Sequence, residues 1–103
     1  MARFAFDGVG AYCIDAIPNQ PQVAHCHSFF IHAHSRGCGH AKRMKKAQCN
    51  KLKELGFNFA TCTTTAENVK QHSVLEACGW ERLTEFDNTQ SGGKTIIWGW
   101  AVK

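Results

Sequence analysis

Residues 31–41 read IHAHSRGCGHA and join an apolar segment to a basic one through a loop with two glycines. The preceding segment, Gln22–Ala33, carries aromatic and β-branched residues at key positions and no proline or glycine, which predicts a central strand. From His40 onward the pattern predicts an amphipathic helix with its lysines on the outer face. Its inner face would be formed by Met44, Ala47, Gln48, Leu52 and Leu55.

The loop Arg36–Ala41, which leads from the predicted strand into the predicted helix, suits an anionic ligand. Glycines let the backbone approach a ligand closely, and successive N–H groups form an anion-binding nest to which a helix N-terminus adds further donors. A pyrophosphate fits such a site, although glycines can also serve turn geometry alone. The loop is no Walker motif, because no Gly-Lys-Ser/Thr ends it. It also departs from the dinucleotide motif G-x-G-x-x-G, since only Gly37 and Gly39 are in register.

Periodicity and turn residues predict the remaining elements. The expected strands are Ala2–Phe6, Ala11–Ile17, Gln22–Ala33, Phe57–Thr63, Trp80–Phe86 and Thr95–Val102. Breaks are expected at Asp7-Gly8, at Pro18, Asn19 and Pro21, at Gly56, at Gly79 and in the polar turn Asn88–Lys94. A second helix is expected over Asn68–Cys78. This order predicts a mixed sheet covered by two helices.

Composition limits the chain to one domain over residues 1–103. The net charge is +4, and many of the basic residues gather in the first predicted helix: Lys42, Arg43, Lys45, Lys46, Lys51 and Lys53. Such a cluster suits an anionic partner, either nucleic acid or a phosphorylated cofactor, or it forms a solvated helix face.

The six cysteines show no C-x-x-C spacing. The first 20 residues lack a basic start followed by an apolar run, so we expect no secretory signal, and no stretch is long enough to cross a membrane. We therefore expect reduced thiols in a cytoplasmic protein, or one in the host cytoplasm if its source is a phage.

Residues 31–41 resemble the signature of the GNAT superfamily of N-acetyltransferases, in which a strand ends V-x-P and runs into R/Q-x-x-G-x-G/A. Here Ala33 stands at the proline position and Ala41 fills the Gly/Ala position. Many GNAT proteins carry N-x-x-A-x-x-L-Y-x-x-x-G-F further on. The corresponding residues here are Asn68, Gln71, Val74, Leu75, Gly79 and Trp80. The resemblance covers residues 22–102.

The resemblance implies an α/β (α+β) fold with a mixed, mostly antiparallel sheet flanked by helices, without the N-terminal strand and two helices usual in the family. It implies acetyl-CoA as acyl-donor cosubstrate, an amine acceptor and no metal. Pantetheine would pair with Phe30, Ile31 and His32, and Asn68 would lie near it. The pyrophosphate would bind Arg36, Gly37, Cys38, Gly39, His40 and Ala41. Leu75 stands where many members have a tyrosine general acid, so that role cannot be transferred.

His25 and His27 lie two residues apart on the predicted central strand and therefore share a face. The His-x-His pattern resembles the catalytic pair of arylalkylamine N-acetyltransferases. A primary amine is mostly ammonium at neutral pH, so a base with a pKa near that of histidine has to accept its proton. We predict that these two histidines are catalytic, with His25 favoured as the base. Cys26 would point to the opposite face, which argues against an acyl-cysteine.

The acceptor and two other function classes stay open. A protein lysine or N-terminus is slightly favoured over a small arylalkylamine, because an acceptor site without a lid suits a displayed amine. A catalytically degenerate GNAT-fold binding protein would keep the fold without the reaction. A zinc- or nucleic-acid-binding module is disfavoured, because the histidines do not form two separated ligand pairs and the basic helix lacks aromatic residues. Oligomerisation stays open.

Overall fold

The computed structural model describes residues 2–103. It contains two α helices and six strands in the order that the sequence predicts. The strands are β1 (Ala2–Phe6), β2 (Gly10–Ile17), β3 (Gln20–Ile31), β4 (Phe59–Thr65), β5 (Glu81–Asp87) and β6 (Lys94–Ala101). The helices are α1 (His40–Glu54) and α2 (Val69–Ala77), and a short 3-10 turn, η1, covers Ala33–Ser35. The predicted α/β class is confirmed.

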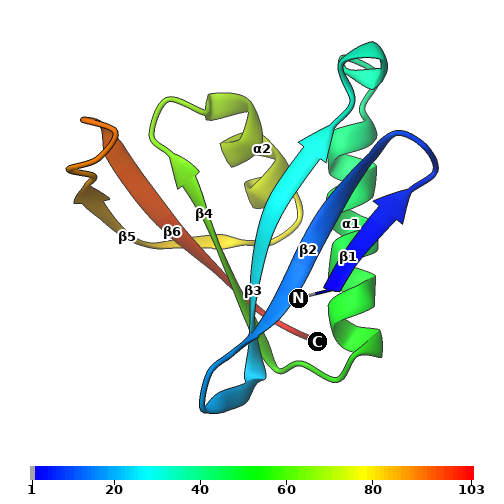
Figure 1. Cartoon of the computed structure of the whole chain (residues 1–103), viewed down its shortest axis with the longest axis horizontal. Helices are drawn as coiled ribbons and strands as arrows, with labels where there is room; N and C mark the ends of the chain where they lie inside the picture. The colour runs from blue at the N-terminus through cyan, green and yellow to red at the C-terminus, as the bar shows by residue number, and fades with distance from the viewer. Residues whose placement is uncertain (1) are drawn as a thin grey trace.

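All six strands form one sheet in the order β1-β2-β3-β4-β6-β5. Only β3 and β4 are parallel, and the other neighbours are antiparallel. Helix α1 connects this parallel pair, as a crossover helix does in a βαβ unit. Figure 1 shows α1 lying along the sheet behind β1 and β2, with α2 nearer β4.

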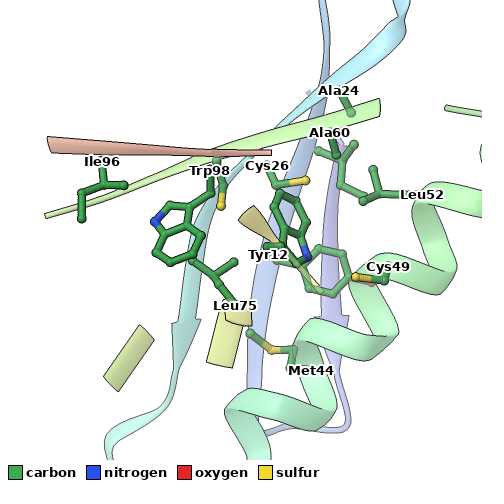
Figure 2. Close-up of a cluster of buried hydrophobic side chains, with 13 residues drawn as sticks. Tyr12, Ala24, Cys26, Met44, Cys49, Leu52, Ala60, Leu75, Ile96 and Trp98 are labelled. Carbon is green, nitrogen blue, oxygen red and sulfur yellow. The ribbon is translucent and has the colours of Figure 1, made fainter. Parts of the chain in front are cut away.

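The core lies on one face of the sheet. Tyr12 from β2 and Trp98 from β6 pack there with Met44 and Leu52 from α1 and Leu75 from α2 (Figure 2). Since alternate residues of a strand point to opposite faces, Ala24 and Cys26 of β3 also belong to this core. Both helices contribute to the same core cluster. His25 and His27 alternate with Ala24 and Cys26 along β3, so they lie on the opposite face of the sheet.

The structure corrects two details of the β3 prediction. Strand β3 begins at Gln20 and includes Pro21, which was expected to interrupt the chain. Pro21 is exposed near the start of the strand, where a missing N–H donor is tolerated. The strand also ends at Ile31, because the chain turns into η1 directly afterwards.

The predicted faces of α1 are partly wrong. Lys45 is 1% exposed, although its position was assigned to the solvated face. Leu55, expected on the inner face, follows the helix as its C-terminal cap and is 49% exposed. Within residues 2–103, no helix combines the length and apolar character needed to span a membrane.

Candidate active site

Strands β3 and β4 pair over a short distance only. Their ladder contains the pairs Val23↔Phe59, Ala24↔Ala60 and His25↔Thr61. Beyond His25 the strands diverge, and Figure 1 shows their arrowheads pointing apart with α2 beside the opening. Two strands that part leave backbone polar groups along the gap without a neighbouring strand, and these groups need other partners. The opening is therefore a place where an extended ligand can pair with β3.

A cavity of about 750 Å³ lies at the outer end of this opening. Strand β3, the loop before α1 and the first turn of α2 contribute its walls. Its lining residues are Phe29, Phe30, Ile31, Ser35, Arg36, Gly37, Gly39, His40, Ala41, Asn68, Lys70 and Gln71. Eight of the ten residues that the sequence predicts for the donor are among them. His32 and Cys38 do not line the cavity.

The loop before α1 exposes backbone donors to this cavity. Gly37 and Gly39 have φ values of 82° and 74°, a region that glycine enters without steric cost. Gly39 is the N-cap of α1, and neither a side-chain cap nor an acidic residue satisfies the first turn. Among residues 2–103, no group accepts a hydrogen bond from the N–H of residues 37–39. The uncapped N–H groups and the helix dipole favour an anion here.

Two side chains shape the mouth of the outer cavity. Arg36 donates from Nε to the Ile31 carbonyl oxygen at 3.0 Å, which holds the loop against the end of β3. Asn68 is the N-cap of α2, and its Oδ1 accepts a hydrogen bond from the backbone N–H of Gln71 at 3.4 Å. Asn68 thus caps α2 in addition to lining the cavity wall opposite the loop.

An inner cavity of about 240 Å³ continues from the outer one. The two share Phe29, Asn68 and Gln71 as lining residues. The remaining lining residues of the inner cavity are Cys26, His27, Ser28, Lys45, Cys62, Thr63 and Thr64. The gap between β3 and β4 therefore forms a path from the glycine loop to one of the two predicted catalytic histidines.

His27 is held by Asp15 of β2. Its Nε2 lies 2.6 Å from Asp15 Oδ2, and this hydrogen bond lowers the pKa of the Asp15 carboxyl group below its ordinary value. Because a carboxylate accepts, the His27 proton lies on Nε2, which leaves Nδ1 as the basic nitrogen 3.0 Å from Ser28 Oγ. In the β2–β3 ladder Asp15 lies directly opposite His25, and His27 reaches it from the diagonal position two residues on. A bulge follows His27, since Ser28 and Phe29 face Tyr12 alone and Ser28 has a φ of 52°.

His25 lies beside His27 with its ring stacked at a centroid distance of 6.0 Å, which agrees with the predicted shared face. Its Nδ1 is 2.9 Å from Thr61 Oγ1 on β4. Burial lowers the pKa of His25, the charge of His27 lowers it further, and Asp15 acts in the opposite direction. His25 lies where the two strands still pair and lines neither of the two cavities described above.

Cys26 and the single tyrosine, Tyr12, belong to the core on the other face of the sheet. All six cysteines are free, and Cys26 points into the core as the sequence predicts. Burial raises the pKa of the Cys26 thiol to about 12, so it is a poor nucleophile at neutral pH. Tyr12 is buried against Phe4 at a ring distance of 5.5 Å, and burial also raises its pKa. No group of His, Cys, Asp or Glu side chains among residues 2–103 is arranged to hold a metal ion.

Several residues that line these cavities were not predicted from the sequence. Phe29, Ser35, Lys70 and Gln71 adjoin predicted residues, so extending each motif by one or a few positions would have included them. Asp15 carries no local signal, because its role depends on the register between β2 and β3. For Lys45 the sequence indicates only a place in a basic helix, and neither its burial nor its position at the inner cavity.

Comparison with known proteins connects this arrangement to one family. Residues 5–80 match the model of the acetyltransferase (GNAT) family, which is about three quarters of the chain. A search of the curated proteins gives no significant match.

Solved structures share the fold at low sequence identity. An acetyltransferase from Bacillus subtilis in complex with CoA superposes with a TM-score of 0.80 at 17% identity, covering 97% of this chain and 74% of that one. The IAA acetyltransferase from Bacillus cereus gives 0.78 at 16%, covering 90% and 69%. The ribosomal-protein-S18-alanine N-acetyltransferase from Escherichia coli gives 0.77 at 12%, covering 92% and 62%. The chain thus spans between 62% and 74% of the length of these structures.

Proposed function

The chain belongs to the acetyltransferase (GNAT) family, and from that premise we propose that it transfers an acetyl group from acetyl-CoA to a primary amine. The observation that carries this proposal is the gap between β3 and β4, which opens onto an uncapped helix start at one end and reaches His27 at the other. An elongated gap with backbone N–H donors at one end and an imidazole at the other suits the transfer of an acetyl group from CoA to an amine.

The donor site follows from the lining of the outer cavity. The pyrophosphate would accept hydrogen bonds from the N–H groups of Gly37, Gly39 and the first turn of α1, where nothing among residues 2–103 competes with it. The pantetheine arm would then extend along Phe30 and Ile31 past Asn68. Arg36, His40 and Ala41 border the same cavity, whereas His32 and Cys38 would act through their backbone at most.

The base would come from the histidine pair. His27 lines the inner cavity, and its Nδ1 lies next to the Ser28 hydroxyl, which can relay a proton. The amine nitrogen would attack the thioester carbonyl carbon directly, without an acyl-cysteine, and its proton would pass to this imidazole. His25 stacks on His27 and shares the exposed face, so it would assist in the same relay. The geometry thus supports His27 ahead of His25 as the first acceptor of the proton.

The acceptor would approach the sheet face that bears the histidines. In the part of the chain that the structure describes, both helices supply the core on the other face. An uncovered face suits an amine displayed on a protein, either a lysine or an N-terminus, slightly more than a small amine. One structural neighbour is named for acetylating an alanine of a ribosomal protein, so this fold accommodates such acceptors elsewhere.

The direct experiment measures free CoA thiol released from acetyl-CoA in the presence of a panel of peptides, proteins and small amines. We expect turnover with at least one displayed amine and none without an acceptor. Calorimetry with CoA is run in parallel. CoA binding without turnover on any acceptor would favour the catalytically degenerate alternative, and the absence of CoA binding would refute the proposal.

A further inference from the structure

Lys45 is a lysine in the interior of the protein. It is 1% exposed, and its Nζ donates a hydrogen bond of 2.7 Å to Gln48 Oε1. The same ammonium group lies 4.5 Å from the ring centroid of Trp80 and 4.9 Å from that of Phe29. Among residues 2–103, no carboxylate lies within salt-bridge distance of it. A buried charge is costly without an ionic partner, so this cation lacks the group that would normally accompany it.

Lys45 and its neighbour Gln48 have more buried hydrogen-bond donors than acceptors. An ammonium has three N–H donors, and among residues 2–103 Gln48 provides the one oxygen that accepts from it. Gln48 is itself 0% exposed, and its Nε2 finds no acceptor in residues 2–103. Buried donors without acceptors are rare in folded proteins and call for an explanation. A ligand that brings an acceptor or a negative charge would supply one.

In the described part of the chain, the side chains around Lys45 supply no anion at neutral pH. Four thiols interact with the charge of Lys45: Cys26 from β3, Cys62 from β4, Cys49 from α1 and Cys78 after α2. Burial raises the pKa of each, to about 12 for Cys26, and this effect outweighs the opposite pull of Lys45. The thiols therefore stay neutral.

Lys45 is placed where the reactive end of the donor would arrive. It lines the inner cavity together with His27, and Phe29 beneath its ammonium lines both cavities. A pantetheine arm that enters from the glycine loop would carry its sulfur toward this cavity. The group that develops negative charge there during the reaction is the leaving thiolate.

We propose that Lys45 is a catalytic residue whose ammonium contacts the thioester sulfur and stabilises the thiolate as it leaves. The inference rests on the proposed function. In the step, the amine nitrogen bonds to the carbonyl carbon and the C=O electron pair moves to oxygen. That pair then reforms the carbonyl, the C–S bond breaks, and its electrons stay on sulfur. The amine proton passes to the histidine pair, and the thiolate takes a proton from Lys45, which solvent restores. Lys45 would thus serve in place of the acid that Leu75 cannot provide.

The test compares the binding of CoA and of desulfo-CoA, in which hydrogen replaces the thiol, by calorimetry between pH 6.5 and 9.5. A free thiol ionises near pH ~8.5, and contact with an ammonium favours its thiolate. In the wild type we expect the affinity ratio of CoA to desulfo-CoA to rise about tenfold across this range. Protonation changes of protein groups that do not contact the sulfur affect both ligands alike and cancel in the ratio. In Lys45→Met the ratio should stay flat.

The outcomes separate this inference from the proposed function. A flat ratio in the wild type, with CoA still bound, overturns the role of Lys45 and leaves the donor site intact. A rise that persists in Lys45→Met also overturns it. If neither ligand binds the wild type, both proposals fail. Should Lys45→Met not fold, Lys45→Gln removes the charge while keeping a polar group, and Lys45→Arg, which keeps a cation, should retain the rise.

Discussion

At the residue scale, the contact between Asp15 and His27 decides which nitrogen can act as a base. The carboxylate holds the proton on Nε2 and leaves Nδ1 free to accept another. We expect His27→Ala to lower acetyl transfer by roughly 10²- to 10⁴-fold at neutral pH, the range for losing a general base. CoA affinity, measured by calorimetry, should change little, and raising the pH should partly restore the rate because the amine then loses its proton to solvent.

The matched variants are His25→Ala and Asp15→Asn. His25 lies beside His27 but lines neither cavity, so its loss should cost less than that of His27. Asp15→Asn removes the group that orients the ring and should lower the rate by about tenfold or more, but less than His27→Ala does. Equal rates in all three variants and the wild type would make the histidines structural residues of the strand.

His25 also makes a prediction about stability. Burial lowers its pKa in the folded protein below the ordinary value of 6.5, so the unfolded chain binds more protons just below that pH. The free energy of unfolding therefore does not depend on His25 protonation above about pH 6.5. It declines as the pH falls from there through the folded pKa of His25, because unfolding then takes up a proton. We expect the urea midpoint of unfolding to decrease between pH 6.5 and 5, and His25→Gln to reduce this slope. The lowered pKa of Asp15 acts in a more acidic range and does not interfere.

At the element scale, the turn between β3 and α1 holds the donor site. A Cβ at Gly39 would meet nothing within 4 Å, so a side chain there points into open space at the mouth of the cavity. We expect Gly39→Glu to abolish acetyl-CoA binding in calorimetry, because it places a carboxylate beside the site for the pyrophosphate.

Gly56→Glu is the control for this change. Gly56 has a φ of 86°, compared with 74° for Gly39, and also faces open space, but it follows the opposite end of α1. Both variants carry the same charge and a similar backbone penalty. Similar losses of affinity in the two would point to destabilisation of α1 and away from a specific anion site.

The elements themselves were largely predictable because their signals are local. Glycines at 37, 39, 56 and 79 all adopt positive φ, at or next to the predicted breaks. The errors arise where position depends on tertiary structure. Helical spacing could not tell that Lys45, beside the apolar stripe, turns inward. It also could not tell that α1 ends at Glu54 and leaves Leu55 exposed. Likewise, no local pattern could pair Asp15 with His27, because that contact depends on the register between β2 and β3, which places Asp15 opposite His25.

At the scale of the whole molecule, basic residues lie at both ends of α1. Lys42 lies in the first turn of α1 beside the glycine loop, whereas Lys53 lies in the last turn. Arg43 already contacts other side chains, with Nη1 2.6 Å from His40 Nδ1 and its guanidinium over the Phe6 ring. The charge near the loop, rather than the net charge of +4, should therefore govern binding of the phosphates.

We expect Lys42→Glu to weaken CoA binding by about three- to tenfold at low salt, with a smaller effect at high salt. Lys53→Glu changes the net charge equally and should leave the affinity nearly unchanged. A glutamate in the first turn also suits the helix dipole, so lost affinity in Lys42→Glu cannot be attributed to a weaker helix. If Lys53→Glu proves as harmful, the cluster more plainly serves a macromolecular partner. Calorimetry at two ionic strengths distinguishes these results.

The loop that surrounds the donor site also contains a chemical reporter. Cys38 is the one exposed thiol among the six, while Cys78 is half-buried and the others are buried. Alkylation by iodoacetamide should therefore label this position first, and mass spectrometry can read the modification without engineering the chain. Saturating CoA should slow the labelling of Cys38, because the phosphates would crowd the loop, and should leave the slower labelling of Cys78 unchanged. The intact protein thus allows occupancy of the site to be followed by footprinting, even before any acceptor is known.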